Sequence, residues 1–596
     1  MTSTTPSDTL PSTASGATGA PEAAGSEAAA RLRIADLERR LGDPWDEANP
    51  LGHTAVLAAD ERGEVLPEAE RVLDEFGLNA EFVPTALGGR MERADVLARV
   101  LRPVFRRDPS LGFGYGATSY LAASAVWAAG TPEQQRSTAE QLLGGGRLAV
   151  AYRDLAHGNA FLRDEFTARR HEGGFLVDGE KKVISNADRA EGLVLFCRTG
   201  EAQGGQSHSA LLLDRTALPA ERVRDLPRHQ TLGLRGCRMG GLGLTDCPVP
   251  EDALLGRWGG GVELALSSFQ LTRSVLPSMV LAGADTLLRT TTRFAVERGV
   301  RGRPGVLNPL ARASLVGAFL DLLICDSLAL TSTRAAHLYP EATQVYASAT
   351  KYLLPIVLTD TSYDLSVLLG SNVYLRDGEF GIFQKHVRDL PVTSLGHSGA
   401  AACQSTIIPQ LPGLAARWFA GPAPAATLFR PGDGLPPLDH DRLRPVAAAY
   451  DPLAAELVAA EGEPWPDGPA GEYGELLRTL VSDLTGHLAE LRDACRSLSL
   501  QGRSVANPRS YALVDRYTLM LAVASCLGVW RHGTGGSDDF LADPVWLLAA
   551  LFRLGRRLGL NLPQQPKGLE EPVFQELLAR YHDGSSLDLY RTPAAH

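Results

Sequence analysis

Residues 175–187 read FLVDGEKKVISNA, and this stretch decides how the chain is organised. At its centre Asp178-Gly179 is a dipeptide typical of the tight turn of a β-hairpin. Apolar residues of the kind found in strands flank it on both sides, namely Phe175, Val177 and Val183. Two apolar runs of strand length follow, at residues 193–196 and 210–213. We therefore expect a hairpin turn at Asp178-Gly179 within a compact β domain that covers residues 149–260.

Helical spacing surrounds this β domain. Apolar residues recur at intervals of three and four before it, as in Val72 and Phe76, and after it, as in Leu271 and Val275. The pattern predicts an N-terminal helical domain at residues 31–148 and a helical bundle domain at residues 261–420. The expected fold class is therefore mostly α with an inserted β domain.

The two ends of the chain differ from this central part. Residues 1–30 are mostly Thr, Ser, Ala, Gly and Pro, so we expect a disordered tail. Residues 421–441 are rich in Pro and Gly and are predicted to be a linker. A stripe that includes Leu477, Leu484 and Leu488 then predicts a C-terminal helical domain over residues 442–596.

The composition excludes several classes of function. The formal net charge of −11 over 596 residues argues against a nucleic-acid partner, which would need a basic face. Seven scattered cysteines without a CxxC pair predict reduced thiols in a cytoplasmic protein and no zinc site. Because no uninterrupted apolar run is long enough to span a bilayer and the N-terminus lacks a signal-peptide pattern, no membrane partner is expected.

Several motifs occur in an order that is specific although each motif alone is weak. They are residues 83–89 (VPTALGG), 152–159 (YRDLAHGN), 179–187 (GEKKVISNA), 232–237 (LGLRGC), 298–302 (RGVRG) and 388–389 (RD). In this order they resemble the acyl-CoA dehydrogenase superfamily, which includes the acyl-CoA oxidases, over about residues 31–419. The resemblance implies an N-terminal helical domain, a middle β-barrel and a helical bundle, and the C-terminal part looks like the extra helical domain of the oxidases.

The resemblance also implies FAD, a small acyl substrate and a homodimer or homotetramer. In the family, two loops of the β domain contact the flavin ring, and Asn159, Ser185 and Asn186 match polar positions of those loops. Arg298 matches the arginine that meets the FAD diphosphate across a dimer interface. From the residues alone, Asn186 is equally a turn residue and Arg298 a cation at a helix end.

Three departures from the family pattern lie close to the expected flavin site. Val183 replaces a tryptophan, Arg301 a phenylalanine and Arg153 a threonine. Arg153 places a cation beside the flavin or an anionic substrate group, or forms a surface ion pair with Asp154.

The catalytic glutamate of the family is missing. Counted from Arg388-Asp389 without gaps, its position is taken by His397, and the alternative position on an earlier helix is taken by Thr272. His397 could be the base, since neutral imidazole accepts a proton near neutral pH, or it could be a loop histidine. The backbone N–H of residue 397 remains available to polarise a substrate carbonyl in either case.

Two alternative functions require no base at all. A β-keto acid could lose CO₂ to give the same enolate, as in the α,β-epoxyketone synthases, which resemble this superfamily and combine decarboxylation, dehydrogenation and oxygenation. Alternatively, the protein could be a catalytically silent acyl-binding protein. The sequence favours an FAD-dependent oxidoreductase of specialised metabolism, with His397 and Arg153 as candidate catalytic residues.

Overall fold

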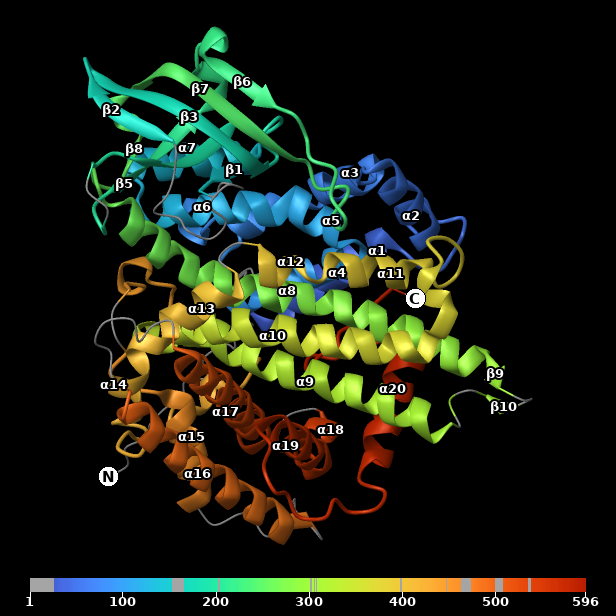
Figure 1. Ribbon diagram of the computed structural model, residues 1–596. Coiled ribbons are helices and arrows are strands. Elements are labelled where there is room, and N and C mark those ends of the chain that lie inside the picture. The colour runs from blue at the N-terminus through green and yellow to red at the C-terminus, as the bar shows by residue number, and fades with distance from the viewer. Residues whose placement is uncertain are drawn as a thin grey trace, which may run out of the picture.

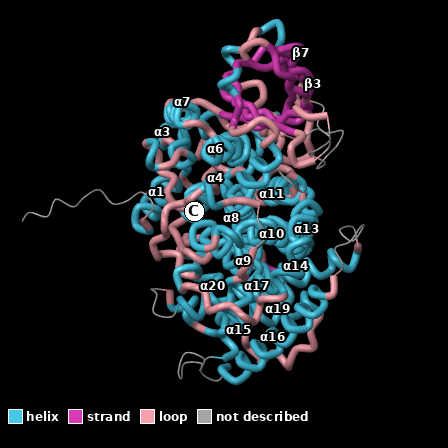
Figure 2. The backbone as a smooth tube through the Cα atoms, turned by 90° about the vertical axis from the view of Figure 1, so that its left-hand side faces the viewer, coloured by secondary structure: helices cyan, strands magenta, loops and turns pink. Residues whose placement is uncertain are grey.

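The computed structural model of the protein describes residues 26–152, 166–201, 204–300, 303–304, 306, 308–396, 399–445, 448–462, 473–498, 507–533 and 538–595. A β domain stands at one end, and helices from the rest of the chain are stacked beneath it (Figure 1). The side view separates strands and helices in the same way (Figure 2). The predicted fold class, mostly α with an inserted β domain, is confirmed.

The N-terminal part is helical and packs directly on the central bundle. Its helices are α1 (Glu27–Leu41), α2 (His53–Arg62), α3 (Pro67–Phe76), α4 (Ala94–Arg107), α5 (Pro109–Leu111), α6 (Thr118–Ala129) and α7 (Pro132–Leu143), with the π-helical turn η3 (Gly112–Ala117) before α6. The predicted disordered tail at residues 1–30 is wrong at its last residues. There the Ser26 side chain caps α1, and Glu27 forms an ion pair with Arg99 at 2.6 Å.

The β domain is one curved sheet. Its strands are β1 (Leu148–Ala151), β2 (Thr167–His171), β3 (Gly174–Ser185), β4 (Gly192–Arg198), β5 (His208–Asp214), β6 (Val223–Leu226), β7 (Met239–Pro250) and β8 (Leu254–Leu255). They pair in the order β6-β7-β3-β2-β4-β5-β8, and β1 pairs with β4 in parallel. The implied barrel is not closed in the described part, because the short end strands β6 and β8 do not pair with each other.

Strand β4 shows why this domain folds against the helices. Leu193 and Leu195 point into the core of the β domain, whereas Val194 and Phe196 belong to the core that the helices share. Successive side chains of a strand face opposite sides, so an uninterrupted apolar run buries both faces of β4. Helix α6 covers the helical side of the sheet next to β1.

The predicted hairpin turn at Asp178-Gly179 is wrong. Strand β3 runs through both residues and pairs with β7 on each side of them. The pairing register shifts between Val177 and Gly179, where a step of two residues in β3 faces a step of three in β7, so the extra residue of the bulge lies on β7. At this irregularity Asp246 of β7 has a φ of 42° and Gly179 of β3 has a φ of 132°. The turn between β2 and β3 lies earlier, at Gly173, where φ is 72°.

Long helices form the centre of the molecule. The elements after the β domain are α8 (Gly261–Glu297), β9 (Gly299–Val300), β10 (Arg303–Pro304), α9 (Pro309–Leu338), α10 (Pro340–Leu369), α11 (Gly381–Asp389), α12 (Val392–Leu395), α13 (Ala400–Ile407) and α14 (Leu411–Ala415). Helices α8, α9 and α10 pack against one another, and α4 joins them. By length and composition alone the helical segments Pro309–Leu338, Pro340–Tyr374 and Pro508–Gly533 could cross a membrane. Their most apolar stretches are buried inside the protein to 89%, 50% and 78%, respectively.

The C-terminal part extends this helical body. It contains α15 (Pro452–Gly462), α16 (Gly474–Arg496), α17 (Pro508–Gly533), α18 (Asp539–Ala542), α19 (Pro544–Leu558) and α20 (Glu570–His582). Helices α17, α19 and α20 contact α9, and one hydrophobic core runs through all the helical parts. The predicted linker packs on this body, because Leu428 and Phe429 are fully buried and Arg334 donates to the carbonyl of Thr427.

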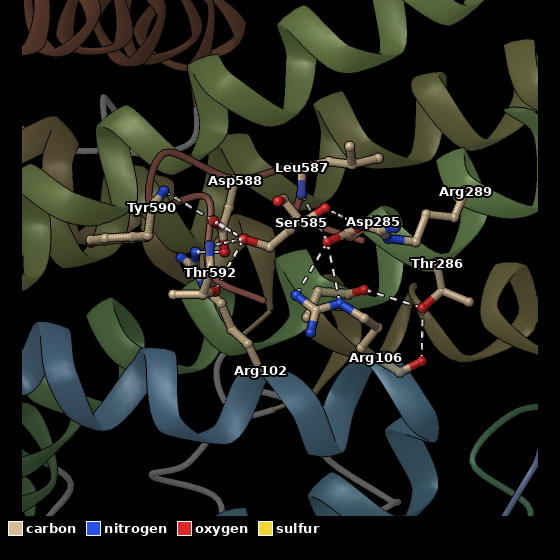
Figure 3. A network of polar contacts seen from close by, with 12 residues as sticks. Arg102, Arg106, Asp285, Thr286, Arg289, Ser585, Leu587, Asp588, Tyr590 and Thr592 are labelled. Atoms are coloured by element: carbon tan, nitrogen blue, oxygen red, sulfur yellow. Dashed lines mark hydrogen bonds and ion pairs between the residues drawn. The ribbon is translucent and has the colours of Figure 1, made fainter. Parts of the chain in front are cut away.

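The segment after α20, residues 585–595, inserts between α4, α8 and α9. Arg102 of α4 pairs with both Asp588 of this segment and Asp326 of α9. The N–H of Leu587 donates to Asp285 of α8 at 3.2 Å, and the N–H of Leu589 donates to Asp326 at 3.0 Å. Figure 3 shows Arg102 beside Asp588 and Leu587 beside Asp285. Residues 585–595 therefore connect helix α4 of the N-terminal part to helices α8 and α9 of the central bundle.

Candidate functional site

A cavity of about 150 Å³ lies where the β domain meets the helices. Its walls come from β1, the ends of β3 and β7, η3, α6, α8, α10 and α12. In Figure 1 these elements meet between the β domain and the stack of helices. Most of the lining side chains are apolar, among them Val150, Val183, Leu276 and Val392. Such a pocket, apolar with a few polar groups, is the usual form of a cofactor or substrate site.

Ser185 is the sequence-predicted residue that the structure places in this cavity. It ends β3, is half-buried and lines the wall beside Val183, the position that departs from the family's tryptophan. The Cys237 thiol lies 3.8 Å from its hydroxyl oxygen and donates weakly to it. Burial raises the pKa of Cys237 to about 11, so the thiol is neutral near pH 7 and adds no negative charge to the cavity wall.

Asn186 connects the end of β3 to the helical side of the cavity wall. Its backbone is left-handed, with a φ of 61°, which asparagine tolerates better than most residues. Its side-chain Nδ2 donates to the carbonyl of Gly114 in η3 at 2.6 Å, and its Oδ1 accepts from Arg189 at 3.1 Å. The next residue back from Gly114, Phe113, lines the cavity. Asn186 thus joins the end of β3 to the helical side, and a contact with a flavin stays a prediction.

Two motifs that are far apart in the sequence meet at the cavity. The N–H of Leu234, which lines the wall, donates to Asp389 at 2.6 Å, and Arg388 donates to the carbonyl of Leu232 at 2.9 Å. A Cβ on Gly233 would lie 2.2 Å from the carbonyl oxygen of Arg388, so only glycine fits there. The Arg-Asp pair therefore holds the loop that closes one side of the cavity.

Lys351 is a cavity residue that the sequence motifs did not reveal. It lies in the middle of α10, its side chain is 2% exposed, and its ammonium donates to the carbonyl of Gly396 at 3.0 Å and to the carbonyl of Thr393. Among the described residues that line the cavity it is the one with a formal charge, and none of them is Asp, Glu or His. The signal that could have revealed it is that Lys351 is the one charged residue between Glu341 and Asp360 in the sequence.

The second position that the family uses for its base also carries no carboxylate. Thr272 is fully buried in α8, and its hydroxyl donates to the carbonyl of Phe269 at 3.2 Å. No group of three or more His, Cys, Asp or Glu side chains in the described ranges is arranged to hold a metal ion.

Arg298 lies too far from the cavity to serve it within one chain. Helix α8 rises about 1.5 Å per residue and carries Arg298 about 33 Å beyond Leu276, which lines the cavity. The guanidinium lies 5.3 Å from the ring centre of Phe380 and is exposed. Its predicted contact with an FAD diphosphate therefore requires the flavin of a second copy of the chain.

Three predicted site residues lie outside the described residues: Arg153, Asn159 and His397. Arg153 follows Tyr152 in sequence and His397 follows Gly396, and both preceding residues line the cavity. Their predicted roles stay predictions.

Comparisons with known proteins agree with this architecture. The family model for the C-terminal domain of acyl-CoA dehydrogenases matches residues 259–410. The isovaleryl-CoA dehydrogenase of Solanum tuberosum mitochondria is 26% identical over 235 residues, which are 39% of this chain. The alignment covers 56% of that protein, so this chain spans little more than half of it. The human mitochondrial short-chain specific acyl-CoA dehydrogenase is 24% identical over 357 residues, which are 59% of this chain and 84% of that one.

Solved structures share the fold. An acyl-CoA dehydrogenase of Bacillus anthracis in complex with FAD superposes with a TM-score of 0.68 at 15% identity, over 92% of each chain. The prolyl acyl carrier protein oxidase AnaB superposes with a TM-score of 0.55 at 16% identity, over 63% of this chain and 97% of its own. The first of these matches extends over most of the C-terminal helical part as well.

Proposed function

Because this chain belongs to the acyl-CoA dehydrogenase superfamily, we propose that it is an FAD-dependent oxidoreductase that acts on an acyl thioester or an acyl-derived substrate in specialised metabolism. The observation that carries the proposal is the cavity between the β domain and the bundle, with Ser185 and Lys351 in an apolar wall and no carboxylate among its described residues. An ordinary fatty-acid dehydrogenase needs such a carboxylate to remove the α-proton.

The residues present fit a flavin. Val150, Val183 and Val392 supply apolar surface for a flat ring, and the Ser185 hydroxyl can hydrogen-bond to its polar edge. Bound FAD would take up the two electrons that leave the substrate. The diphosphate would be held by Arg298 of a second copy, and the proposal therefore includes a homodimer or a homotetramer.

Two routes to the oxidised product avoid a glutamate. In the first, the α-proton of an acyl thioester passes to the imidazole of His397, and the C–H bonding electrons remain as an enolate. In the second, a β-keto acid loses CO₂, and the electrons of the broken C–C bond give the same enolate without any base. The absence of Asp, Glu and His among the described lining residues supports the second route as an alternative function.

The proposal also covers the carrier to which the acyl group is attached. The structural relative AnaB acts on a prolyl group attached to an acyl carrier protein. We extend this to a substrate that is bound either to CoA or to a carrier protein, because both present the acyl group on the same phosphopantetheine arm.

The test begins with the purified protein, which should be yellow and absorb in the flavin bands. Under the first route, anaerobic mixing with saturated acyl thioesters of CoA and of N-acetylcysteamine should bleach the flavin, and His397→Ala should abolish the bleaching. Under the second route, only β-keto acids should bleach it, CO₂ should be released in equal amount, and His397→Ala should change little. A protein that binds no FAD, or whose FAD neither substrate class reduces, would overturn the proposal in favour of a silent acyl-binding protein.

A further inference from the structure

A second cavity, of about 270 Å³, lies between the N-terminal helices and the second half of α8. Its walls come from α1, the loop between α1 and α2, α4, α8 and the end of α20. Along α8, Thr286 of this cavity lies ten residues beyond Leu276 of the first cavity, which is about 15 Å at a rise of 1.5 Å per residue. The second cavity is therefore separate from the proposed flavin site and independent of the function proposed there.

Four arginines line the second cavity, and three of them already have carboxylate partners. Arg106 and Arg289 share Asp285, as Figure 3 shows. Arg106 also pairs with Glu38. Arg293 lies 3.3 Å from a carboxylate oxygen of Glu297 and 3.0 Å from one of Glu379. The protein itself therefore neutralises these three guanidinium groups.

The fourth arginine, Arg107, is the exception. It is 4% exposed, and its guanidinium donates to the backbone carbonyls of Gly42 and Leu51. A guanidinium has five N–H donors, so two carbonyls leave some of them unused. Burial lowers the pKa of Arg107 to about 10, although the more distant carboxylates Glu38 and Asp43 oppose this change. In the part of the chain that the structure describes, Arg107 is thus a buried cation without a carboxylate in contact.

The two carboxylates that line the cavity are engaged elsewhere. Glu38 accepts from Arg106 and from the N–H of Ala595, the latter at 3.0 Å. Asp43 is exposed and accepts from the N–H of Trp45 at 2.8 Å. Neither of them replaces a counter-ion in direct contact with the buried guanidinium.

A second buried group of this cavity also has an unused polar atom. His53 is 7% exposed and lines the cavity, and its Nδ1 has no hydrogen-bond partner among the described residues. Burial lowers the pKa of His53 well below its usual value, so the ring is neutral and adds no further charge. Buried polar atoms without a partner are rare, and one beside a cavity indicates that a polar molecule binds there.

The size and the aromatic side chains of the cavity fit more than a lone ion. A water molecule takes up about 30 Å³ in the liquid, so the space is large enough for a small organic molecule. Trp45, Tyr581 and His582 contribute flat rings to the wall, and the Arg293 guanidinium lies 4.8 Å from the ring centre of Trp45. Aromatic rings of this kind pack against flat ligands.

We propose that this cavity is a second binding site, which takes the carboxylate or phosphate group of a small organic anion with Arg107 as its counter-ion. The planar fork of a guanidinium matches two oxygens of either group. Because Arg107 also holds the carbonyls of Gly42 and Leu51, the bound anion joins the loop between α1 and α2 to α4. Binding therefore stabilises the folded protein.

The test uses the full-length protein as purified and the sodium salts of phosphate, AMP and benzoate. Calorimetric titration and the melting temperature would be compared with NaCl at the same ionic strength. At least one salt should bind at one site per chain with a Kd below about 1 mM and raise the melting temperature. Binding of phosphate shows that the oxyanion suffices, binding of AMP alone that the ring is needed, and binding of benzoate that a carboxylate is accepted.

Substitutions connect the binding to this cavity. Arg107→Gln should weaken it at least about tenfold, because the counter-ion is lost. Arg39→Gln, at an exposed arginine of α1 outside the cavity wall, should leave the Kd within about twofold. His582 is exposed and lines the cavity, so His582→Glu adds a negative charge there without disturbing the core and should weaken binding about fivefold. His582→Gln should leave the Kd within about twofold.

Three results would overturn the proposal while leaving the proposed function standing. The first is that none of the three salts binds saturably up to about 10 mM. The second is a folded Arg107→Gln variant with unchanged affinity. Where Arg107→Gln does not fold, the third applies, namely equal affinities of His582→Glu and His582→Gln.

Discussion

At the scale of single residues, Leu234 shows how the Arg-Asp motif shapes the site. This leucine has a left-handed backbone with a φ of 51°, which costs a residue with a Cβ about 1–2 kcal/mol. The bond from its N–H to Asp389 holds it there, and Asp389 also accepts from Lys385. One carboxylate therefore supports both the cavity loop and a buried cation.

Replacing Asp389 tests this support. Asp389→Ala should lower the free energy of unfolding by about 2–3 kcal/mol, because it leaves the buried N–H of Leu234 without its acceptor and removes one of the two carboxylates beside the buried Lys385 ammonium, while Asp108 remains. The same variant should lose FAD during gel filtration, since the loop 232–237 lines the cavity. Asp377→Ala, at an exposed position, should change stability by less than about 0.5 kcal/mol in the same urea titration. A decrease of less than about 1 kcal/mol in the free energy of unfolding of Asp389→Ala would contradict the view that Asp389 supports the cavity loop and Lys385.

Asn186 gives a second prediction at this scale. Asn186→Gly keeps the left-handed backbone but removes the bond to Gly114, which should cost about 1–3 kcal/mol. Asn186→Ala loses the same bond and adds the strain of a Cβ, about 1–2 kcal/mol more. Urea unfolding of the two flavin-loaded variants should rank alanine as the less stable. The reverse order would mean that the backbone conformation at residue 186 is not left-handed.

How far the sequence could predict the site depends on whether a residue's neighbours are close in the chain. Ser185 was assigned to the site from a local motif, and the structure places it in the cavity wall. Lys351 was not, because its partners Thr393 and Gly396 are some forty residues away and nothing local says which side of α10 faces a cavity. The same holds for the meeting of residues 232–234 with Arg388-Asp389.

At the scale of elements, the pairing of strand β3 explains why the predicted hairpin turn at Asp178-Gly179 is wrong. An Asp-Gly pair is compatible with a hairpin turn and with a bulge, and local sequence does not distinguish them. The long strand β7 pairs with β3 on both sides of Asp178-Gly179, and the register shift there places the extra residue of a bulge on β7 opposite this pair. Tertiary pairing decided the outcome, whereas the presence of an inserted β domain followed correctly from the change in periodicity.

The backbone conformation of Gly179 supports a prediction at this scale. At Gly179 the φ of 132° is a conformation that residues with a Cβ rarely adopt. Gly179→Ala should therefore destabilise the protein by at least about 1 kcal/mol in urea unfolding. Gly205→Ala is the matched control in the same domain, because its φ is ordinary and a Cβ there meets nothing within 4 Å. Equal stability of the two variants would show that Gly179 does not have this backbone conformation.

At the scale of the whole molecule, the sequence could predict the order of helical and β segments, but not that the helical segments share one hydrophobic core. Periodicity shows that a segment is helical and which face is apolar, and it does not show which segment covers that face. The helical parts therefore appeared as separate domains, although one core joins them. The segment at residues 585–595 has no periodicity at all, and its place between α4, α8 and α9 depends on contacts with residues hundreds of positions away.

This segment supports a prediction about the assembled fold. Asp588→Asn should lower the free energy of unfolding by about 3 kcal/mol, because it removes one carboxylate from the buried Arg102 while Asp326 remains. Asp583→Asn, whose carboxylate is 58% exposed beside Arg591, should cost less than about 1 kcal/mol. Both values come from urea titrations at pH 7.

The pH dependence of this difference follows from the direction of the shift. Burial would raise the pKa of Asp588, but Arg102 and the Ser586 hydroxyl outweigh it and hold the pKa below its usual range. A lowered pKa in the folded state stabilises the protein at every pH above the ordinary value of about 4, and this contribution is lost only as the pH falls further. The gap between the wild-type protein and Asp588→Asn should therefore stay constant from pH 8 to pH 5. A gap that narrows within that range would mean that Asp588 takes up a proton there and that the ion pair does not hold the C-terminal segment.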